Sequence, residues 1–331
     1  MSRVEQFLLG GGHFLSGGSG RASLHIGLVN NMPDAALRAT ELQFARLLKA
    51  AAGSLDVRLR LFSLHSIARG EQACSRMAGF YDDAAFLQAS NIDALIITGA
   101  QPCAADLRNE PYWAELAHLI DWAEIGTIST LFSCLAAHAA VLHLDGIARR
   151  PLAAKLSGVY DSVRTEDDPL FFNTAPSVPV PHSRRNDIAQ ADLTAKGYRV
   201  LSRLSNGQAD IFTREPPGHS RFVFFQGHPE YDPGTLGREY LRDMGRFLCG
   251  ETAERPALPE NYFDRATEDR LAEIAGESDL ARYQEIVVGA LPRQVWRSNT
   301  VRLFGNWLTL VAAAKARREV SRSVHTRRRA S

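Results

Sequence analysis

The chain has 331 residues, a formal net charge of +1, and apolar and charged fractions of 45% and 23%. These values are those of a globular protein with a substantial core, built as one large α/β domain or two smaller ones. A net charge this close to zero gives no electrostatic reason to expect nucleic-acid or membrane partners. No segment approaches the roughly 20 continuous apolar residues of a membrane-spanning helix, and the N-terminus is too briefly apolar for a signal peptide.

Strand and helix patterns alternate along the first 250 residues. After a Gly- and Ser-rich flexible arm at 1–22, apolar runs predict buried strands at 24–29, 94–99, 128–132 and 221–225, and alternation of apolar and polar residues predicts one at 57–62. Helical spacing follows from about residue 35, at 112–122, at 135–144 and at 235–247. This alternation predicts an α/β core over 23–250, with a mostly parallel sheet and helices on both of its faces.

The remaining segments give weaker signals. The stretch 150–220 has no clear period, and the prolines in 178–181 exclude regular helix there. We expect 251–315 to be a C-terminal extension that packs on the core, with a helix at 296–313. The arginine-rich end, 316–331, is expected to be a solvated, disordered tail rather than a nucleic-acid contact.

The four cysteines, Cys74, Cys103, Cys134 and Cys249, lack the spacing of a disulfide framework or a metal site. A reducing cytoplasm is therefore the expected compartment, and a thiol nucleophile persists there. Cys134 is the candidate nucleophile because it lies where a buried strand gives way to a helix. The N-terminus of that helix favours the thiolate, and the backbone N–H of Leu135 is placed to form part of an oxyanion hole. The alternative is a small buried hydrophobe, which most free cysteines are.

A second strand-to-helix junction carries His228-Pro229-Glu230. In an open parallel sheet, such junctions meet at the crevice outside the carboxyl ends of the strands. A carboxylate at Glu230 can hold the imidazole of His228 in one tautomer, so that its other nitrogen accepts a proton from sulfur. Cys134, His228 and Glu230 then form a nucleophile, a base and an orienting group for acyl transfer.

Other polar residues allow two interpretations. Arg242, in the helix after His228, is either a surface ion-pair partner or a bidentate ligand for an α-carboxylate. Asn30 and Asn31 follow the first strand, where they either cap a turn or face a ligand. Pro-His-Ser-Arg at 181–184 is interpreted as a structural turn.

Several segments occur in a characteristic order along the chain. They are Gly-Leu-Val-Asn-Asn-Met-Pro (27–33), Thr-Glu-Leu-Gln-Phe (40–44), Thr-Leu-Phe-Ser-Cys (130–134), Lys-Leu-Ser-Gly-Val-Tyr (155–160), Pro-His-Ser-Arg (181–184), Gly-His-Pro-Glu-Tyr-Asp (227–232) and Asn-Trp-Leu (306–308). With them, residues 22–313 resemble the homoserine O-acyltransferase family of the homoserine O-succinyltransferase type, an enzyme family of methionine synthesis. The resemblance implies a flavodoxin-like core similar to that of class I glutamine amidotransferases.

The resemblance also implies roles for individual residues. Cys134 takes an acyl group from acyl-CoA as a thioester, and His228, oriented by Glu230, activates the hydroxyl of homoserine. Arg242 falls on the position that binds the amino-acid carboxylate, with Lys155, Ser183 and Glu239 on or near other active-site positions. No metal or bound cofactor is implied, since acyl-CoA is a co-substrate, and the assembly expected for the family is a homodimer.

The chain departs from the family pattern in its donor region. The family position that separates acetyl from succinyl donors, usually Gly or Glu, is Cys103 here, and the usual lysine after Met-Pro is missing, since Asp34, Ala35 and Ala36 follow. Succinyl is favoured because no acidic side chain at Cys103 repels its carboxylate, although acetyl stays open. Serine differs from homoserine by one methylene, so it stays open as the acceptor.

Two further classes remain as alternatives. One is a glutamine amidotransferase or related hydrolase on the same core. That class prefers glycine on both sides of its nucleophile, whereas Ser133 and Leu135 flank Cys134 here. The other is a non-catalytic binding protein that keeps the fold, for which no acyl-enzyme is expected.

Overall fold

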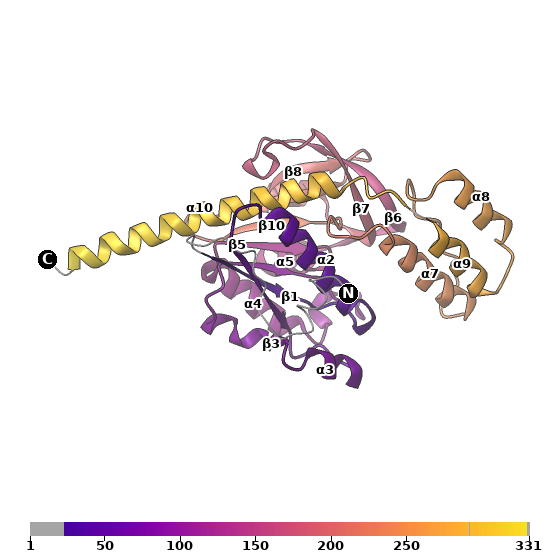
Figure 1. Ribbon diagram of the computed structural model, residues 1–331, viewed down its shortest axis with the longest axis horizontal. Helices are drawn as coiled ribbons and strands as arrows, with labels where there is room; N and C mark the ends of the chain where they lie inside the picture. Colours follow the sequence, from indigo (N-terminus) through magenta and orange to yellow (C-terminus); the bar gives the residue numbers. More distant parts are fainter. Residues whose placement is uncertain (1–22, 291, 330–331) are drawn as a thin grey trace.

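A ten-stranded sheet forms the centre of the molecule (Figure 1). The computed structural model describes residues 23–290 and 292–329, with side chains up to Ser321, so the arm predicted at 1–22 lies outside the described residues. The strands are β1 (Leu24–Val29), β2 (Val57–Ser63), β3 (Tyr81–Asp83), β4 (Ala94–Ile97), β5 (Ser129–Ser133), β6 (Arg150–Arg164), β7 (Ser177–Asp187), β8 (Arg199–Leu204), β9 (Ala209–Arg214) and β10 (Arg221–Phe225).

The sheet has a parallel and an antiparallel part, in the order β3-β2-β1-β4-β5-β10-β9-β8-β6-β7. Every neighbouring pair from β3 to β10 is parallel, and every pair from β10 to β7 is antiparallel. The segment β2-β1-β4-β5-β10 has the strand order of flavodoxin-like folds. The predicted flavodoxin-like α/β class is therefore confirmed.

Helices cover both faces of the sheet. They are α2 (Asp34–Ala51), α3 (Glu71–Met77), α4 (Trp113–Gly126), α5 (Leu135–Asp145), α6 (Gln190–Ala195), α7 (Thr235–Leu248), α8 (Arg265–Glu273), α9 (Leu280–Gly289) and α10 (Arg297–Arg329), with short 3-10 helices η1 (Ala84–Ala89), η2 (Leu107–Asn109) and η3 (Pro169–Phe171). Helices α4 and α5 pack on one face of the parallel strands, whereas α2 and α10 pack on the other. Strands covered on both sides read as continuous apolar runs, which is why the sequence revealed them.

The segment 150–220 is more regular than its sequence indicated. Strands β6 and β7 form a long antiparallel hairpin, so the Pro-His-Ser-Arg motif is extended strand and not a turn. Pro179 and Pro181 are tolerated because β7 is the last strand of the sheet, where a residue without an N–H group removes no inner ladder bond.

The end of the chain returns to the core. Helices α7, α8 and α9 form a separate apolar cluster around Tyr283, Met244 and Trp296, at the opposite end of the molecule from the free end of α10 (Figure 1).

We expected a disordered tail from 316, but α10 continues to Arg329. No Gly or Pro follows Gly305, and the residues beyond it are largely helix-formers such as Ala, Arg and Lys.

Among the described residues, no helix combines the length and the apolarity needed to cross a bilayer.

Helix α10 is anchored beneath the parallel strands by Trp307, which is 1% exposed and whose Nε1 donates to Ser129 Oγ at 3.0 Å. Trp307→Ala removes a large buried ring, so we expect the free energy of unfolding to fall by about 3–5 kcal/mol. Urea denaturation measures this change. The control is Thr309→Ala, at an exposed position of the same helix, which should stay within about 0.5 kcal/mol of the parent. Equal effects of the two changes would contradict the anchoring role.

Candidate active site

The polypeptide makes a strained turn at Cys134. Its φ of 51° and ψ of −109° lie outside the helical and strand regions, between the end of β5 and the start of α5 at Leu135. Its N–H donates to the carbonyl of Phe225 at 2.7 Å, which continues the β5–β10 pairing by one residue. A non-glycine residue keeps such a conformation only where its surroundings enforce it, and such residues cluster at functional sites. The turn presents the thiol at the carboxyl end of the parallel strands.

The backbone N–H of Leu135 opens the first turn of α5, where N–H groups have no carbonyl partner within the helix. The loop after β4 approaches this point closely. A Cβ on Gly99 would lie 2.9 Å from the Leu135 Cβ and 3.2 Å from its nitrogen, so only glycine fits there without movement. The N–H of Leu135 therefore stays in the position predicted for an oxyanion donor, and that role remains a prediction.

His228 and Glu230 lie beside the thiol. His228 Nδ1 is 2.9 Å from Glu230 Oε1, and both residues are buried. The imidazole also interacts with the side chain of Cys134, which helps to raise the pKa of His228. The main chain of His228 is held by β7, because its N–H donates to the carbonyl of Pro181 at 2.7 Å. The structure thus brings together the three side chains that the sequence singled out for catalysis.

The charges around His228 favour its protonated form. Burial by itself would lower the pKa of the imidazole, but the negative charges of Cys134 and Glu230 and the hydrogen bonds to both hold that pKa well above its usual value. Neighbouring opposite charges outweigh desolvation when they lie within hydrogen-bond reach. The resting site is therefore set up for an imidazolium beside the sulfur.

A second cluster surrounds Glu239 on α7. Its carboxylate accepts hydrogen bonds from Ser183 Oγ and, at 2.7 Å, from the hydroxyl of Tyr231. Lys155 Nζ lies 3.8 Å from Glu239 Oε2 and 2.7 Å from Asp243 Oδ2. Lys155, Ser183 and Glu239, which come from β6, β7 and α7, are therefore neighbours, as the family resemblance implied.

Tyr231 joins the two clusters, and sequence reasoning did not assign it a role. Its ring stacks on that of His228 with centroids 4.3 Å apart and an angle of 15° between the planes. Burial and the nearby Glu239 and Glu230 raise its pKa well above the usual value, so it stays a neutral donor. The sequence feature that could have identified Tyr231 is its position directly after His228-Pro229-Glu230.

Arg242 lies at the outer edge of this second cluster. Its Nη2 is 2.8 Å from Asp243 Oδ1, and 56% of its side chain is exposed. Burial lowers its pKa, but Asp243 and Glu239 outweigh that effect and raise it. The guanidinium is thus close to Glu239 yet open to solvent, which suits either of the two interpretations given by the sequence.

Cys103 lies in the exposed loop between β4 and η2. The carboxylate of Glu110 holds this loop, because its Oε1 accepts from the N–H of Cys103 at 2.7 Å and of Ala104 at 2.6 Å. Gly99, in the same loop, touches Leu135. The predicted donor-specificity position therefore belongs to a loop that flanks the Cys134 turn.

Asn30 and Asn31 do not join the site. Asn30 Nδ2 donates to the carbonyl of Leu37 and to the hydroxyl of Tyr81, both at 3.0 Å. The N–H of Asn31 donates to Thr98 Oγ1 at 2.8 Å. Both asparagines are buried and tie β1 to its neighbours, which agrees with the turn-capping interpretation.

A buried polar network connects the two strand-to-helix junctions that carry Cys134 and His228. Gln226, two residues before His228, accepts from His138 Nε2 at 3.0 Å through its Oε1 and donates to Asp187 Oδ1 at 3.2 Å through its Nε2. Arg184 Nη1 reaches the same Asp187 oxygen at 2.9 Å. Burial and then Arg184 lower the pKa of His138 to about 3, so this imidazole is neutral. His138 lies one turn after Cys134, so the network links α5 to β10.

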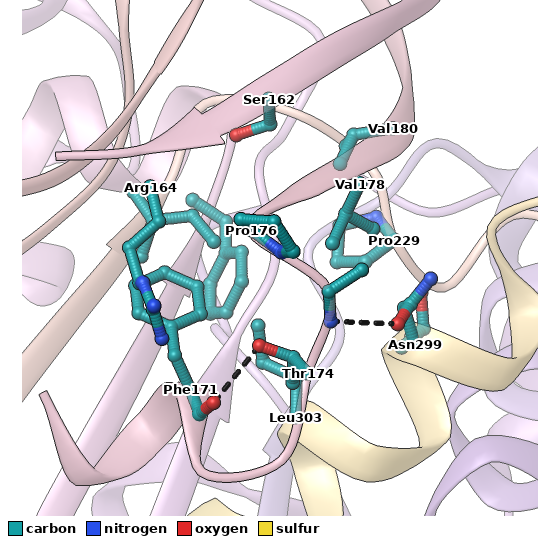
Figure 2. Close-up of a pocket in the computed structure, with 14 residues that line it drawn as sticks. Ser162, Arg164, Phe171, Thr174, Pro176, Val178, Val180, Pro229, Asn299 and Leu303 are labelled. Carbon is teal, nitrogen blue, oxygen red and sulfur yellow. Dashed lines mark hydrogen bonds between the residues drawn. The ribbon is translucent and has the colours of Figure 1, made fainter. Parts of the chain in front are cut away.

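A small cavity lies behind Pro229 (Figure 2). It encloses about 20 Å³ and is lined by apolar side chains of β7, β9, β10, η3 and α10, together with Ser162 and Arg164 of β6. Such a volume holds about one water molecule, so the cavity is too small for a substrate. Among the residues with described side chains, no three His, Cys, Asp or Glu groups gather as metal ligands.

The fold and the site place this chain among α/β proteins with a cysteine at a strand-to-helix turn beside a histidine–carboxylate pair. It is similar at the level of the fold to the crystal structure of SMU.1228c, with a TM-score of 0.51, 15% identity and coverage of 87% of this chain and 99% of the other.

Comparison with known sequences is more specific. The family model described as homoserine O-succinyltransferase matches residues 19–317. The homoserine O-succinyltransferase of Rhodopseudomonas palustris is 50% identical over 298 residues, covering 88% of this chain and 89% of the relative. That of Methylorubrum extorquens is 47% identical over 296 residues, covering 87% of each. The chain therefore belongs to the homoserine O-succinyltransferase family, and the prediction of an O-acyltransferase is confirmed.

The raised pKa of His228 provides a direct test of the site. Cys134→Ser removes the thiolate, and with it one of the charges that favour the imidazolium, so we expect the pKa of His228 to fall. Histidine-selective ¹³C labelling and NMR titration measure it, with His228→Gln used to assign the resonance. The matched control is Cys249→Ser, at an exposed cysteine, which should leave the titration unchanged. A His228 pKa that is the same in Cys134→Ser would show that the two side chains do not interact.

Proposed function

We propose that this enzyme transfers an acyl group, with succinyl favoured over acetyl, from acyl-CoA to the hydroxyl of L-homoserine, as a step of methionine biosynthesis. The observation that carries the proposal is the contact of Cys134 with the His228–Glu230 pair at a strained turn. The names of relatives that are up to 50% identical support the choice of substrates.

In the first half-reaction, the Cys134 thiolate attacks the carbonyl carbon of the acyl-CoA thioester. The negative charge that forms on the carbonyl oxygen is stabilised by the N–H of Leu135 and the N-terminus of α5. When the tetrahedral intermediate collapses, the bond to the CoA sulfur breaks, and the departing thiolate takes a proton from the His228 imidazolium. The acyl group remains on Cys134, and His228 is left neutral.

In the second half-reaction, His228 is the base. The thioester on Cys134 carries no charge, so one of the interactions that raise the pKa of His228 is absent. The neutral imidazole accepts the proton of the amino-acid hydroxyl, whose oxygen attacks the thioester carbonyl. Cys134 leaves as a thiolate, and the imidazolium–thiolate pair is restored. These steps need acyl-CoA only as a co-substrate and use no bound cofactor.

The Glu239 cluster is the proposed amino-acid site. It combines the cations Lys155 and Arg242 with the anions Glu239 and Asp243, which matches the two opposite charges of an α-amino acid. In this proposal Arg242 binds the α-carboxylate, and Glu239 accepts from the ammonium group. Tyr231 connects this cluster to His228, so a bound amino acid has its side-chain hydroxyl close to the base. Serine is an alternative acceptor, one methylene shorter.

The central test is the covalent intermediate. Mixing the enzyme with succinyl-CoA alone should add one succinyl group, visible by intact mass, and homoserine should then remove it. Cys134→Ala should abolish both the adduct and the turnover, because no other group in the site is placed to carry the acyl chain. Cys249→Ser is the control and should keep both. Turnover by Cys134→Ala, or intersecting rather than parallel lines in two-substrate kinetics, would refute the ping-pong mechanism.

The amino-acid site is tested with Arg242→Ala. Loss of a bidentate carboxylate contact should raise the KM for homoserine roughly 10- to 100-fold while the rate of acyl-enzyme formation stays unchanged. Arg246→Ala, one turn further along α7 and ion-paired with Glu251, is the matched control and should behave as the parent. An unchanged KM in Arg242→Ala would leave Arg242 as a surface ion-pair partner.

A further inference from the structure

The loop that carries Cys103 is fixed from two sides next to the Cys134 turn. On one side, Glu110 Oε1 accepts from the N–H groups of Cys103 and Ala104. On the other, Arg149 Nη2 donates to the carbonyls of Ala104 and Ala105, both at 3.0 Å. We call residues 99–110 the donor loop, because this segment contains Cys103, the position that the family resemblance connects with the choice of acyl donor.

Arg149 uses only part of its donor capacity on the donor loop. Both hydrogen bonds leave from Nη2, and among the described residues no acceptor lies within hydrogen-bond distance of Nε or Nη1. The side chain is partly exposed, so these N–H groups are open to an incoming ligand. A guanidinium with a free edge is well suited to a carboxylate, which it binds with two parallel hydrogen bonds.

The charge of the guanidinium also interacts with that of the nucleophile. Burial lowers its pKa, while Tyr112, Glu110, Asp106 and Cys134 interact with its charge and act in the opposite direction. Arg149 in turn contributes to the low pKa of His138, one turn after Cys134, after the larger effects of burial and Arg184. Because an arginine stays protonated in proteins, a positive charge is held against the donor loop.

The carboxylates near Arg149 are already engaged by other groups, so its guanidinium has no complete ion-pair partner. Asp106 is paired with Arg108 at 2.7 Å, and Glu110 Oε1 is engaged by two backbone N–H groups. The Glu110 carboxylate is the negative group that would oppose an anionic ligand here. The hydroxyl of Tyr112, buried beside Cys103, has no hydrogen-bond partner among the described residues and is a further donor at this point.

Given the proposed function, we infer that Arg149 receives the distal carboxylate of a dicarboxylic acyl group carried on Cys134, and so selects succinyl-CoA over donors with an uncharged acyl chain. A succinyl group on sulfur extends by three carbon–carbon bonds, about 4 Å, to a carboxylate. The donor loop lines that path, because Gly99 packs on Leu135 at one end and Arg149 binds Ala104 and Ala105 at the other. Acetyl ends two carbon–carbon bonds earlier and carries no carboxylate for the guanidinium to bind.

Three donors separate charge from chain length: succinyl-CoA, butyryl-CoA with the same number of carbons and no carboxylate, and acetyl-CoA. Acyl-enzyme formation with each is followed by rapid-quench intact mass for the parent, Arg149→Gln and Arg149→Lys. For Arg149→Gln, the rate constant per donor concentration with succinyl-CoA should fall roughly 10- to 100-fold, and that with butyryl-CoA and acetyl-CoA should stay within about twofold. Arg149→Lys keeps the charge and should restore part of the preference for succinyl.

The comparison between donors is made within one protein, so partial unfolding of a variant cancels. If Arg149→Gln slows all three donors equally, the residue only positions the donor loop, and the inference is wrong. A preference for succinyl that is unchanged in Arg149→Gln, or a parent that favours acetyl-CoA, overturns it as well. A parent that forms no acyl-enzyme with any donor refutes the proposed function itself, and the two failures are therefore distinguishable.

Discussion

The site depends on the parallel pairing of β5 with β10. In this pair Phe132 lies opposite Phe224 and Ser133 opposite Phe225, and the N–H of Cys134 extends the ladder to the carbonyl of Phe225. The thiol and the histidine are 94 residues apart in the sequence, yet they leave the sheet at the same edge because their strands are adjacent. A shift of one residue in this register would turn every side chain of one strand to the opposite face, and Cys134 and His228 would no longer meet.

Much of the parallel core was predictable because strands that are buried on both faces appear as apolar runs in the sequence. The strand predicted at 221–225 matches β10, and that at 24–29 matches β1. The hairpin of β6 and β7 was not predictable in the same way. Its stability comes from pairing over long separations, and its prolines are compatible with a strand only because β7 is at the edge of the sheet. No local pattern reveals which strand will be an edge.

The residues of the candidate site also fall into a group that the sequence pattern predicted and a group that it did not. Cys134, His228 and Glu230 follow strand ends, so their proximity followed from topology. The roles of Lys155, Ser183 and Glu239 came only from the family resemblance, because these residues meet through the tertiary packing of β6, β7 and α7. For Arg242 the sequence left two interpretations open. Tyr231 and Arg149 were missed, since an aromatic residue beside a motif resembles a core residue and an arginine after a helix resembles a surface one. Chemical roles for all of these residues remain predictions.

Helix α10 sets the order in which the protein can be completed during synthesis. Phe304, Trp307, Leu308 and Val311 cover the apolar side of β1, β4 and β5, where they pack together with α2. Until those residues leave the ribosome, the nascent chain exposes the apolar face of these strands, to which other incompletely folded chains can bind. Emergence of residues 304–311, and not that of Cys134, is therefore the step that covers this surface and protects the new chain from aggregation.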